Sequence, residues 1–182
     1  MLLLVDPAGT ALPCLMIPAE FADARAVNLM ATHARGLICL ALDSRIVDAL
    51  HLALQPQTNR RCFATPFTVS IEARRAVSTG ISAADRATTI AAAIRPDARP
   101  GDLATPGHVF PIRVDSDSRT PRPGIPGAAV EICRRAGLRP AAVICEILDP
   151  AGEAPAMSWL QGLAASLNLP VVSGDGGDLL RG

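Results

Sequence analysis

Short apolar segments alternate along this chain with longer segments in which apolar residues recur at helical spacing. Strands are expected at Leu2–Val5, Leu37–Leu42, Phe67–Glu72, His108–Val114, Ala141–Leu148 and Pro170–Ser173. Helices are expected from about Pro18 to Ala34, from Ser44 to Leu54, from Ser82 to about Pro96, around Ala129 to Ala136 and after Pro155. Since strands and amphipathic helices each bury one face, this order predicts an α+β fold. Helices would cover a mixed β-sheet in a three-layer, α/β/α-like arrangement.

Several element boundaries follow from the chemistry of single residues. Ser82 is a good N-cap, and Asp85 follows three residues later. Gly36 and Gly137 are expected to end the helices that precede them. The polar stretches between the periodic segments are expected to be loops, at Asp6 to Cys14, Gln55 to Ala64 and Asp115 to Pro126.

The composition is that of one compact domain. Hydrophobic residues make up 49% of the 182 residues and charged residues 19%, which excludes a disordered chain. We therefore expect a single domain over residues 1–182. The 17 basic and 17 acidic residues balance, so charge gives no reason to expect nucleic acid or an anionic membrane as a partner. No apolar run is long enough for a membrane span and no signal peptide is recognisable, which predicts a cytoplasmic protein.

Cysteine and lysine usage narrows the chemistry. The chain contains no lysine, which excludes a lysine Schiff base. No pair of cysteines has C-x-x-C spacing, and their number is odd, so free thiols are expected rather than disulfides or a zinc site. These cysteines are Cys14, Cys39, Cys62, Cys133 and Cys145.

Four stretches carry a family resemblance. They are His33 to Leu40 (HARGLICL), Phe67 to Ala73 (FTVSIEA), Ser78 to Arg86 (STGISAADR) and Arg99 to Pro111, which contains PGHVFP. In this order they resemble the 3,4-dihydroxy-2-butanone 4-phosphate (DHBP) synthase family, whose members read HGRGLVCL, FTVSVDA, TTGISAADR and RPxDxxxPGHVFP. Val143 to Glu146 (VICE) resembles the stretch that carries a family active-site glutamate. The match runs without gaps from about residue 1 to about residue 173.

The resemblance implies a DHBP synthase-like fold and a homodimer whose pocket lies near the interface. His108 and Thr79 would reach the site of the partner. The implied family reaction converts ribulose 5-phosphate into 3,4-dihydroxy-2-butanone 4-phosphate and formate with the help of Mg²⁺. The family also has a helix ahead of its first strand, which is missing from this sequence.

Two departures affect the implied metal site. Where the family has DxxRExEGD, this chain reads Asp6 to Cys14 (DPAGTALPC), so Thr10 replaces a metal-binding glutamate and Cys14 an aspartate. Where the family has RxGHTE, this chain keeps Arg122 but has Ile125 in place of the metal-binding histidine. Magnesium requires oxygen ligands, usually carboxylates. We therefore expect no metal ion and no other cofactor, and a parent reaction that is lost or very weak.

The candidate catalytic residues are those that could still move protons. Glu146 ends a strongly apolar strand, where a carboxylate is expected to be functional or to form an ion pair. Histidine side chains suit acid–base work near neutral pH, so His108 is a candidate, although a structural histidine is the alternative. Cys14 could be a nucleophile if Arg122 lies near it, or else a buried packing residue.

The candidate substrate-binding residues are Arg122, Thr79 and Thr10. Arg122 could bind a phosphate through two hydrogen bonds, or could be an ordinary solvated arginine. The function predicted best is a repurposed enzyme that performs a metal-independent reaction on a small phosphorylated or acidic metabolite. The alternatives are a non-catalytic relative that serves as a structural or regulatory partner, and an enzyme that keeps the parent lyase activity.

Overall fold

The computed structural model describes residues 1–6, 8–56, 65–115 and 124–173. Among these residues, seven strands form one mixed sheet in the order β4-β5-β3-β6-β2-β1-β7. The strands are β1 (Leu2–Val5), β2 (Cys14–Pro18), β3 (Arg35–Asp43), β4 (Ile71–Ala73), β5 (Leu103–Val114), β6 (Ala141–Ile147) and β7 (Val171–Ser173). The pairs β1–β7 and β3–β5 are parallel, and the remaining neighbours are antiparallel.

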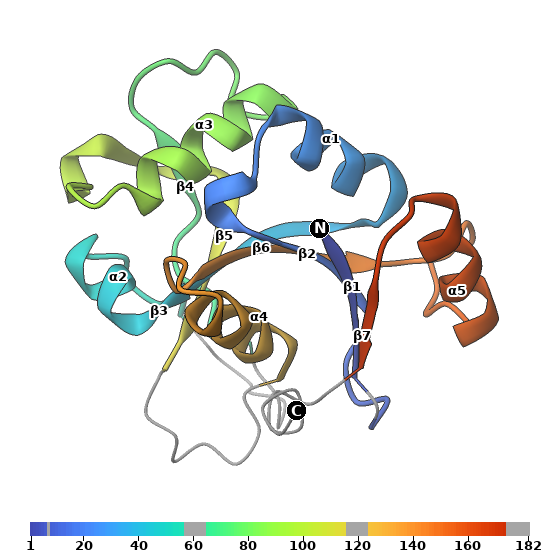
Figure 1. The fold of residues 1–182 in the computed structure, drawn as a ribbon. Coiled ribbons are helices and arrows are strands. Elements are labelled where there is room, and N and C mark those ends of the chain that lie inside the picture. The colour runs from blue at the N-terminus through green and yellow to red at the C-terminus, as the bar shows by residue number, and fades with distance from the viewer. Residues whose placement is uncertain (7, 57–64, 116–123, 174–182) are drawn as a thin grey trace.

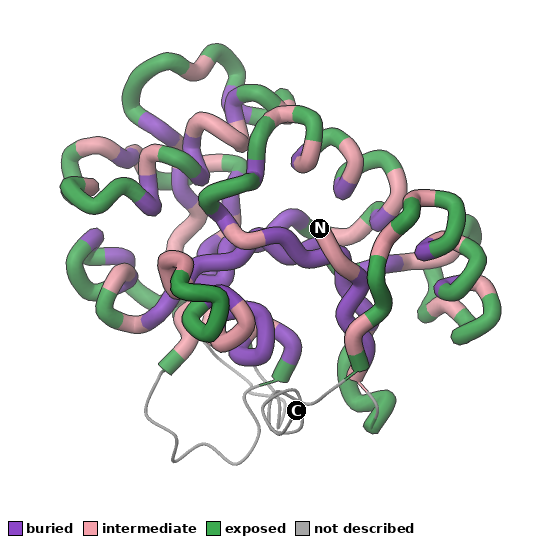
Figure 2. The backbone as a smooth tube through the Cα atoms, viewed as in Figure 1, coloured by how far each residue is buried: buried purple, intermediate pink, exposed green. Residues whose placement is uncertain are grey.

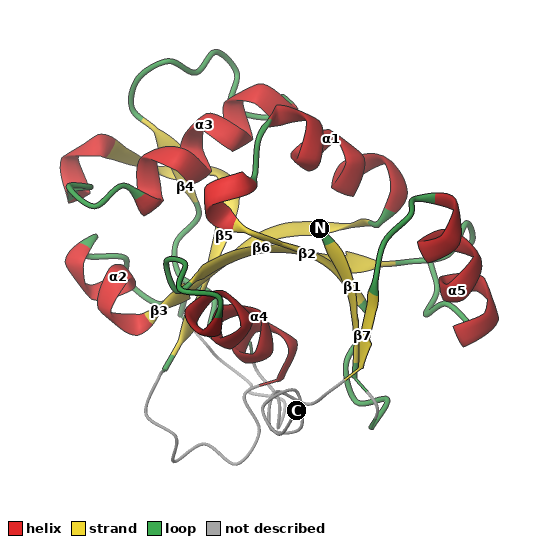
Figure 3. Cartoon of the chain, in the orientation of Figure 1, coloured by secondary structure: helices red, strands yellow, loops and turns green. Residues whose placement is uncertain are grey.

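Helices cover both faces of this sheet (Figure 1). They are α1 (Ala24–His33), α2 (Ser44–Ala49), α3 (Ala83–Ile94), α4 (Gly124–Arg135) and α5 (Met157–Ser166), with short 3₁₀ turns η1 (Ala19–Phe21) and η2 (Pro100–Asp102). One apolar cluster packs α1, α3 and α5 against the sheet, and a second packs α4 against the opposite face. The predicted α+β fold with three layers is confirmed (Figure 3).

The central strands are buried on both faces because helices cover both. The last six residues of β3 are all buried, and so are six of the seven residues of β6 (Figure 2). Such strands read as continuous apolar runs rather than as alternating patterns, which is why the sequence indicated them clearly. Among the described helices, none combines the length and apolar character needed to cross a membrane.

Strand β2 was not predicted from the sequence, and the helix predicted after it was too long. The sequence suggested a loop up to Cys14 and a helix from about Pro18, but Cys14–Pro18 is a strand paired with both β1 and β6. Helix α1 begins only at Ala24, where the Asp23 side chain accepts a hydrogen bond from the backbone N–H of Ala26. Pairing on both sides, which a local pattern does not reveal, fixes this segment as a strand.

Other boundaries moved in both directions. The strand expected at Phe67–Glu72 is only Ile71–Ala73, whereas β5 begins at Leu103 rather than His108. Helix α2 ends at Ala49 instead of Leu54. Helix α4 begins at Gly124, within the expected loop, and contains Pro126 in its first turn, where the missing N–H has no helical partner to lose.

Candidate functional site

The loop after β1 folds around the carboxylate of Asp6. One oxygen accepts hydrogen bonds from the backbone N–H groups of Thr10 (2.8 Å) and Ala11 (3.0 Å), and from the Thr10 hydroxyl (2.6 Å). The other oxygen accepts from the N–H of Ala8. The hydrogen bond from the Thr10 hydroxyl is the main cause that lowers the pKa of Asp6, and the backbone N–H groups lower it further. The Thr10 hydroxyl therefore donates its hydrogen bond within the loop. The substrate-binding role of Thr10 stays a prediction.

Cys14 begins β2 directly opposite Glu146 of β6. Its side chain is buried, and its thiol donates to the carbonyl oxygen of Leu12 at 3.6 Å. Burial, followed by the negative charge of Glu146, raises the pKa of the Cys14 thiol well above its ordinary value. The thiolate that a nucleophile requires is thus disfavoured, and of the two readings the geometry favours a packing cysteine.

Glu146 is the one exposed residue of β6. Its neighbours Cys145 and Ile147 in the strand are both buried, so the exposed carboxylate lies between two core residues. The sequence left open a functional carboxylate and an ion-paired one; no ion pair of Glu146 is found among the described residues, and its functional role stays a prediction. Its carboxylate is accessible to a ligand.

The backbone of Glu146 is also closely approached by the first residues of β3. A Cβ atom placed on Gly36 would lie 2.3 Å from the Glu146 carbonyl oxygen. Glycine at this position therefore allows β3 and β6 to meet beside Glu146. The thiol of Cys145 donates to the Gly36 carbonyl oxygen at 3.3 Å and joins the same two strands from the other face.

His108, on β5, is bound to the carboxylate of Glu72, on β4. The His108 Nδ1 atom lies 2.7 Å from Glu72 Oε2, and the His108 backbone N–H donates to the same oxygen at 3.2 Å. The side chain of His108 is 44% exposed and that of Glu72 15%. An exposed imidazole whose inner nitrogen is held by a carboxylate is a common arrangement for acid–base catalysis.

Glu72 was not among the residues that the sequence singled out. Its only signal was its place in the quoted FTVSIEA stretch, and nothing in the spacing linked it to His108, 36 residues away. Thr79 is exposed in the segment between β4 and α3, beside Gly80, which touches Glu72. Arg122 lies outside the described residues.

The predicted residues therefore fall into two groups. Glu146 lies on β6, Cys14 begins the neighbouring strand β2, and Thr10 lies in the loop before β2. His108 and Thr79 belong to the β4–β5 edge of the sheet, and β3 lies between the two groups in the strand order. We use "β6 group" and "His108 group" for these two sets below.

The positions of the implied metal ligands do not fit magnesium. The Thr10 hydroxyl donates to Asp6, and Ile125 is 4% exposed and packs in the apolar cluster beneath α4. Within the described ranges, no three His, Cys, Asp or Glu side chains gather in a way that could hold a metal ion. A hard cation that needs several oxygen ligands finds a neutral hydroxyl and a buried hydrocarbon at these two positions.

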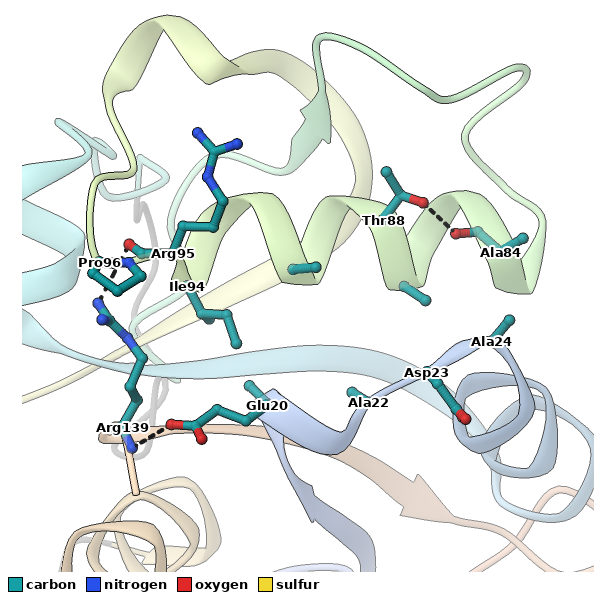
Figure 4. A pocket seen from close by; sticks show the side chains of 13 residues that line it. Glu20, Ala22, Asp23, Ala24, Ala84, Thr88, Ile94, Arg95, Pro96 and Arg139 are labelled. Atoms are coloured by element: carbon teal, nitrogen blue, oxygen red, sulfur yellow. Dashed lines mark hydrogen bonds between the residues drawn. The ribbon is translucent and has the colours of Figure 1, made fainter. Parts of the chain in front are cut away.

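One cavity of the described residues lies elsewhere, in the helical layer. It is a groove of about 880 Å³ between α3, η1 and the start of α1, and its lining combines alanines with the charged side chains of Glu20, Asp23, Arg95 and Arg139 (Figure 4). At one end, the Arg139 backbone N–H donates to Glu20 Oε1 at 2.7 Å, and its guanidinium to the Arg95 carbonyl oxygen at 3.4 Å. None of the predicted site residues lines this groove.

The fold and the quoted motifs define one class of protein. The sequence profile of the 3,4-dihydroxy-2-butanone 4-phosphate synthase family matches residues 1–179. The chain belongs to this family.

Individual relatives agree with that assignment. A protein of Neisseria meningitidis serogroup A, named 3,4-dihydroxy-2-butanone 4-phosphate synthase, is 43% identical over 86% of this chain and 43% of its own length. A synthase of Pseudomonas putida is 41% identical over 85% of this chain and 72% of its own. This chain thus spans less than half of the Neisseria relative.

Solved structures show the same fold. A two-domain synthase from A. baumannii superposes with a TM-score of 0.88 at 34% identity, over 95% of this chain and 51% of that one. A 3,4-dihydroxy-2-butanone 4-phosphate synthase in complex with two magnesium ions also gives a TM-score of 0.88, at 33% identity, over 99% and 88% of the two chains.

Proposed function

We propose that this chain is an enzyme that performs a metal-independent acid–base reaction on a small phosphorylated or acidic metabolite. One observation carries the proposal. His108 and Glu146, whose side chains could move protons, are exposed. At the positions of the implied metal ligands, Thr10 is hydrogen-bonded to Asp6 and Ile125 is buried. This combination favours a repurposed site over one that has lost its functional residues at random.

The chemistry open to these residues is proton transfer beside a carbonyl group. A sugar phosphate forms an enediol when a base removes the proton from the carbon next to the carbonyl and an acid protonates the carbonyl oxygen. In the proposal, His108 exchanges the first proton and Glu146 the second. Arg122 holds the anionic end of the substrate, as the resemblance implies, and Thr79 is a further substrate-binding residue. Each group contributes roughly 10²–10⁴-fold to the rate.

We also propose that the active unit is a homodimer. The β6 group and the His108 group are separated by β3 in the strand order. In a dimer of the kind that the resemblance implies, the His108 group of one chain would complete the β6 group of the other. A shared site of this kind would explain why the two groups lie on different strands of each chain.

The test is a ligand screen followed by an assay. Thermal unfolding is measured with sugar phosphates and related acids, each with Mg²⁺ and again with EDTA, because a bound ligand raises the melting temperature. The expected result is a ligand that stabilises equally in both conditions. Its turnover should be lost in His108→Gln and Glu146→Gln and kept in the control His33→Gln, at the end of α1.

Two outcomes would overturn the proposal. Magnesium-dependent formate release from ribulose 5-phosphate, at the rate of a working synthase, would show that the parent lyase activity is intact. Failure of every ligand to bind, together with unchanged properties of Glu146→Gln, would favour a non-catalytic structural or regulatory partner.

A further inference from the structure

We propose that Glu72 and the turn formed by Ser78–Gly80 are a positioning device that keeps the proton of neutral His108 on Nδ1 and leaves Nε2 free to accept one. The inference rests on the proposed function, in which His108 moves protons. It assigns a role to residues that do not touch a substrate themselves.

The ring of His108 is fixed through a single oxygen atom. Glu72 Oε2 lies 2.7 Å from Nδ1 and accepts a second hydrogen bond from the backbone N–H of His108 at 3.2 Å. A carboxylate only accepts hydrogen bonds, so the ring nitrogen facing it must carry the proton. The other nitrogen, Nε2, then has a free lone pair on the exposed side of the ring.

Gly80 lies directly against the Glu72 carboxylate. Its φ angle is +83°, and a Cβ atom there would lie 2.1 Å from Glu72 Oε2. Only glycine combines this backbone conformation with so close an approach. The turn and the His108 ring therefore both restrict where the carboxylate can lie.

Helix α3 anchors the turn through Asp85. Its Oδ2 atom accepts hydrogen bonds from the Ser78 hydroxyl at 2.9 Å and the Gly80 N–H at 3.0 Å, and Oδ1 accepts from the Ser78 N–H at 3.2 Å. Asp85 is itself fixed, because its N–H donates to the N-cap residue Ser82. The order of support thus runs from α3 through the turn to Glu72 and His108.

A further contact reaches Glu72 from the same helix. The Thr89 hydroxyl lies 3.3 Å from Glu72 Oε1 and 3.0 Å from the Asp85 carbonyl oxygen, so its single proton serves one acceptor at a time. The same hydroxyl accepts the N–H of Ala73, the residue after Glu72. This contact fixes the strand that carries Glu72 more than it fixes the carboxylate.

The test reads the tautomer directly and needs no substrate. The chain has three histidines, so the ¹⁵N-histidine resonances are assigned with His33→Gln and His51→Gln. At a pH where the ring is neutral, His108 should be protonated on Nδ1. Glu72→Ala should shift the population toward the Nε2–H form, and Gly80→Ala should do the same by displacing a chemically intact carboxylate.

The control is Glu153→Ala, which removes an exposed carboxylate after β6 and should leave the His108 resonances unchanged. A wild-type His108 protonated on Nε2 would overturn the inference, even if a variant fails to fold. An unchanged tautomer in folded Glu72→Ala would overturn it as well. If the tautomer is as expected but His108→Gln keeps full turnover, the proposed function fails while the positioning role stands.

Discussion

Cys14 and Glu146 stand opposite each other on β2 and β6, yet burial gives them different chemistry. The carboxylate of Glu146 is exposed, and the thiol of Cys14 is 2% exposed. The side chain of Cys14 packs in the apolar cluster beside α4, as a small hydrophobic residue would.

A labelling experiment should show that Cys14 is inert. Burial raises the pKa of its thiol, so iodoacetamide at mildly alkaline pH should leave Cys14 unlabelled in the native protein. Peptide mapping after unfolding in guanidinium should then show labelling of all five cysteines. Cys14→Ser should lower the free energy of unfolding by about 1–3 kcal/mol, because it buries a hydroxyl. Rapid native labelling of Cys14 would restore the nucleophile hypothesis.

Asp85 should make the stability depend on pH in the acid range. The pKa of Asp85 is lowered below the ordinary value of 3.8, and the hydrogen bond from the Ser78 hydroxyl is the largest cause. The stabilisation is therefore complete above pH 3.8 and disappears as the pH falls through the lower folded-state pKa. Asp85→Asn should be less stable than wild type at neutral pH, and urea unfolding should show that this difference shrinks in acid.

The control for this measurement is Asp97→Asn, whose carboxylate is 78% exposed. Its difference from wild type should stay nearly constant over the same pH range, because an exposed ion pair contributes little. A constant difference for Asp85→Asn as well would mean that its hydrogen bonds do not depend on charge.

At the scale of elements, burial decided what the sequence could predict. β3 and β6 were recognisable because both faces are buried and their residues form apolar runs. Helix α3 was recognisable from Ser82 and Asp85, whose capping bond is present. β2 and β4 were missed or misplaced because each is short and is defined by its partners in the sheet rather than by its own pattern.

The contact between β3 and β6 should tolerate no side chain at Gly36. Gly36→Ala places a Cβ atom 2.3 Å from the Glu146 carbonyl oxygen, so one strand must move. We expect a loss of about 1–3 kcal/mol in the free energy of unfolding, measured by chemical denaturation. Gly162→Ala is the matched control. It lies inside α5 with open space around it and should stabilise by about 0.5–1 kcal/mol. Equal effects of the two changes would contradict the close approach.

At the scale of the whole molecule, the motifs predicted the fold better than the site. The four long stretches that resemble the family predicted the architecture, and the fold is that of the family. The pairing of His108 with Glu72 was beyond reach, because it depends on the antiparallel contact of β4 with β5. The exposure of Glu146 between the buried residues Cys145 and Ile147 depends on tertiary packing, which no local pattern encodes. Arg122 lies outside the described residues, so its place in the site stays a prediction.

The proposed homodimer gives the last prediction. If the His108 group of one chain completes the β6 group of the other, sedimentation at micromolar concentration should give twice the chain mass of 18.9 kDa. A mass of one chain would contradict the shared site. A dimer alone does not prove sharing, so the decisive measurement combines two inactive variants. Co-expressed His108→Gln and Glu146→Gln chains form mixed dimers in about half of all cases, and each mixed dimer has one intact site of two. Turnover of the ligand found in the screen should then return to about a quarter of wild type. If each site lies within one chain, the mixture should stay as inactive as either variant alone.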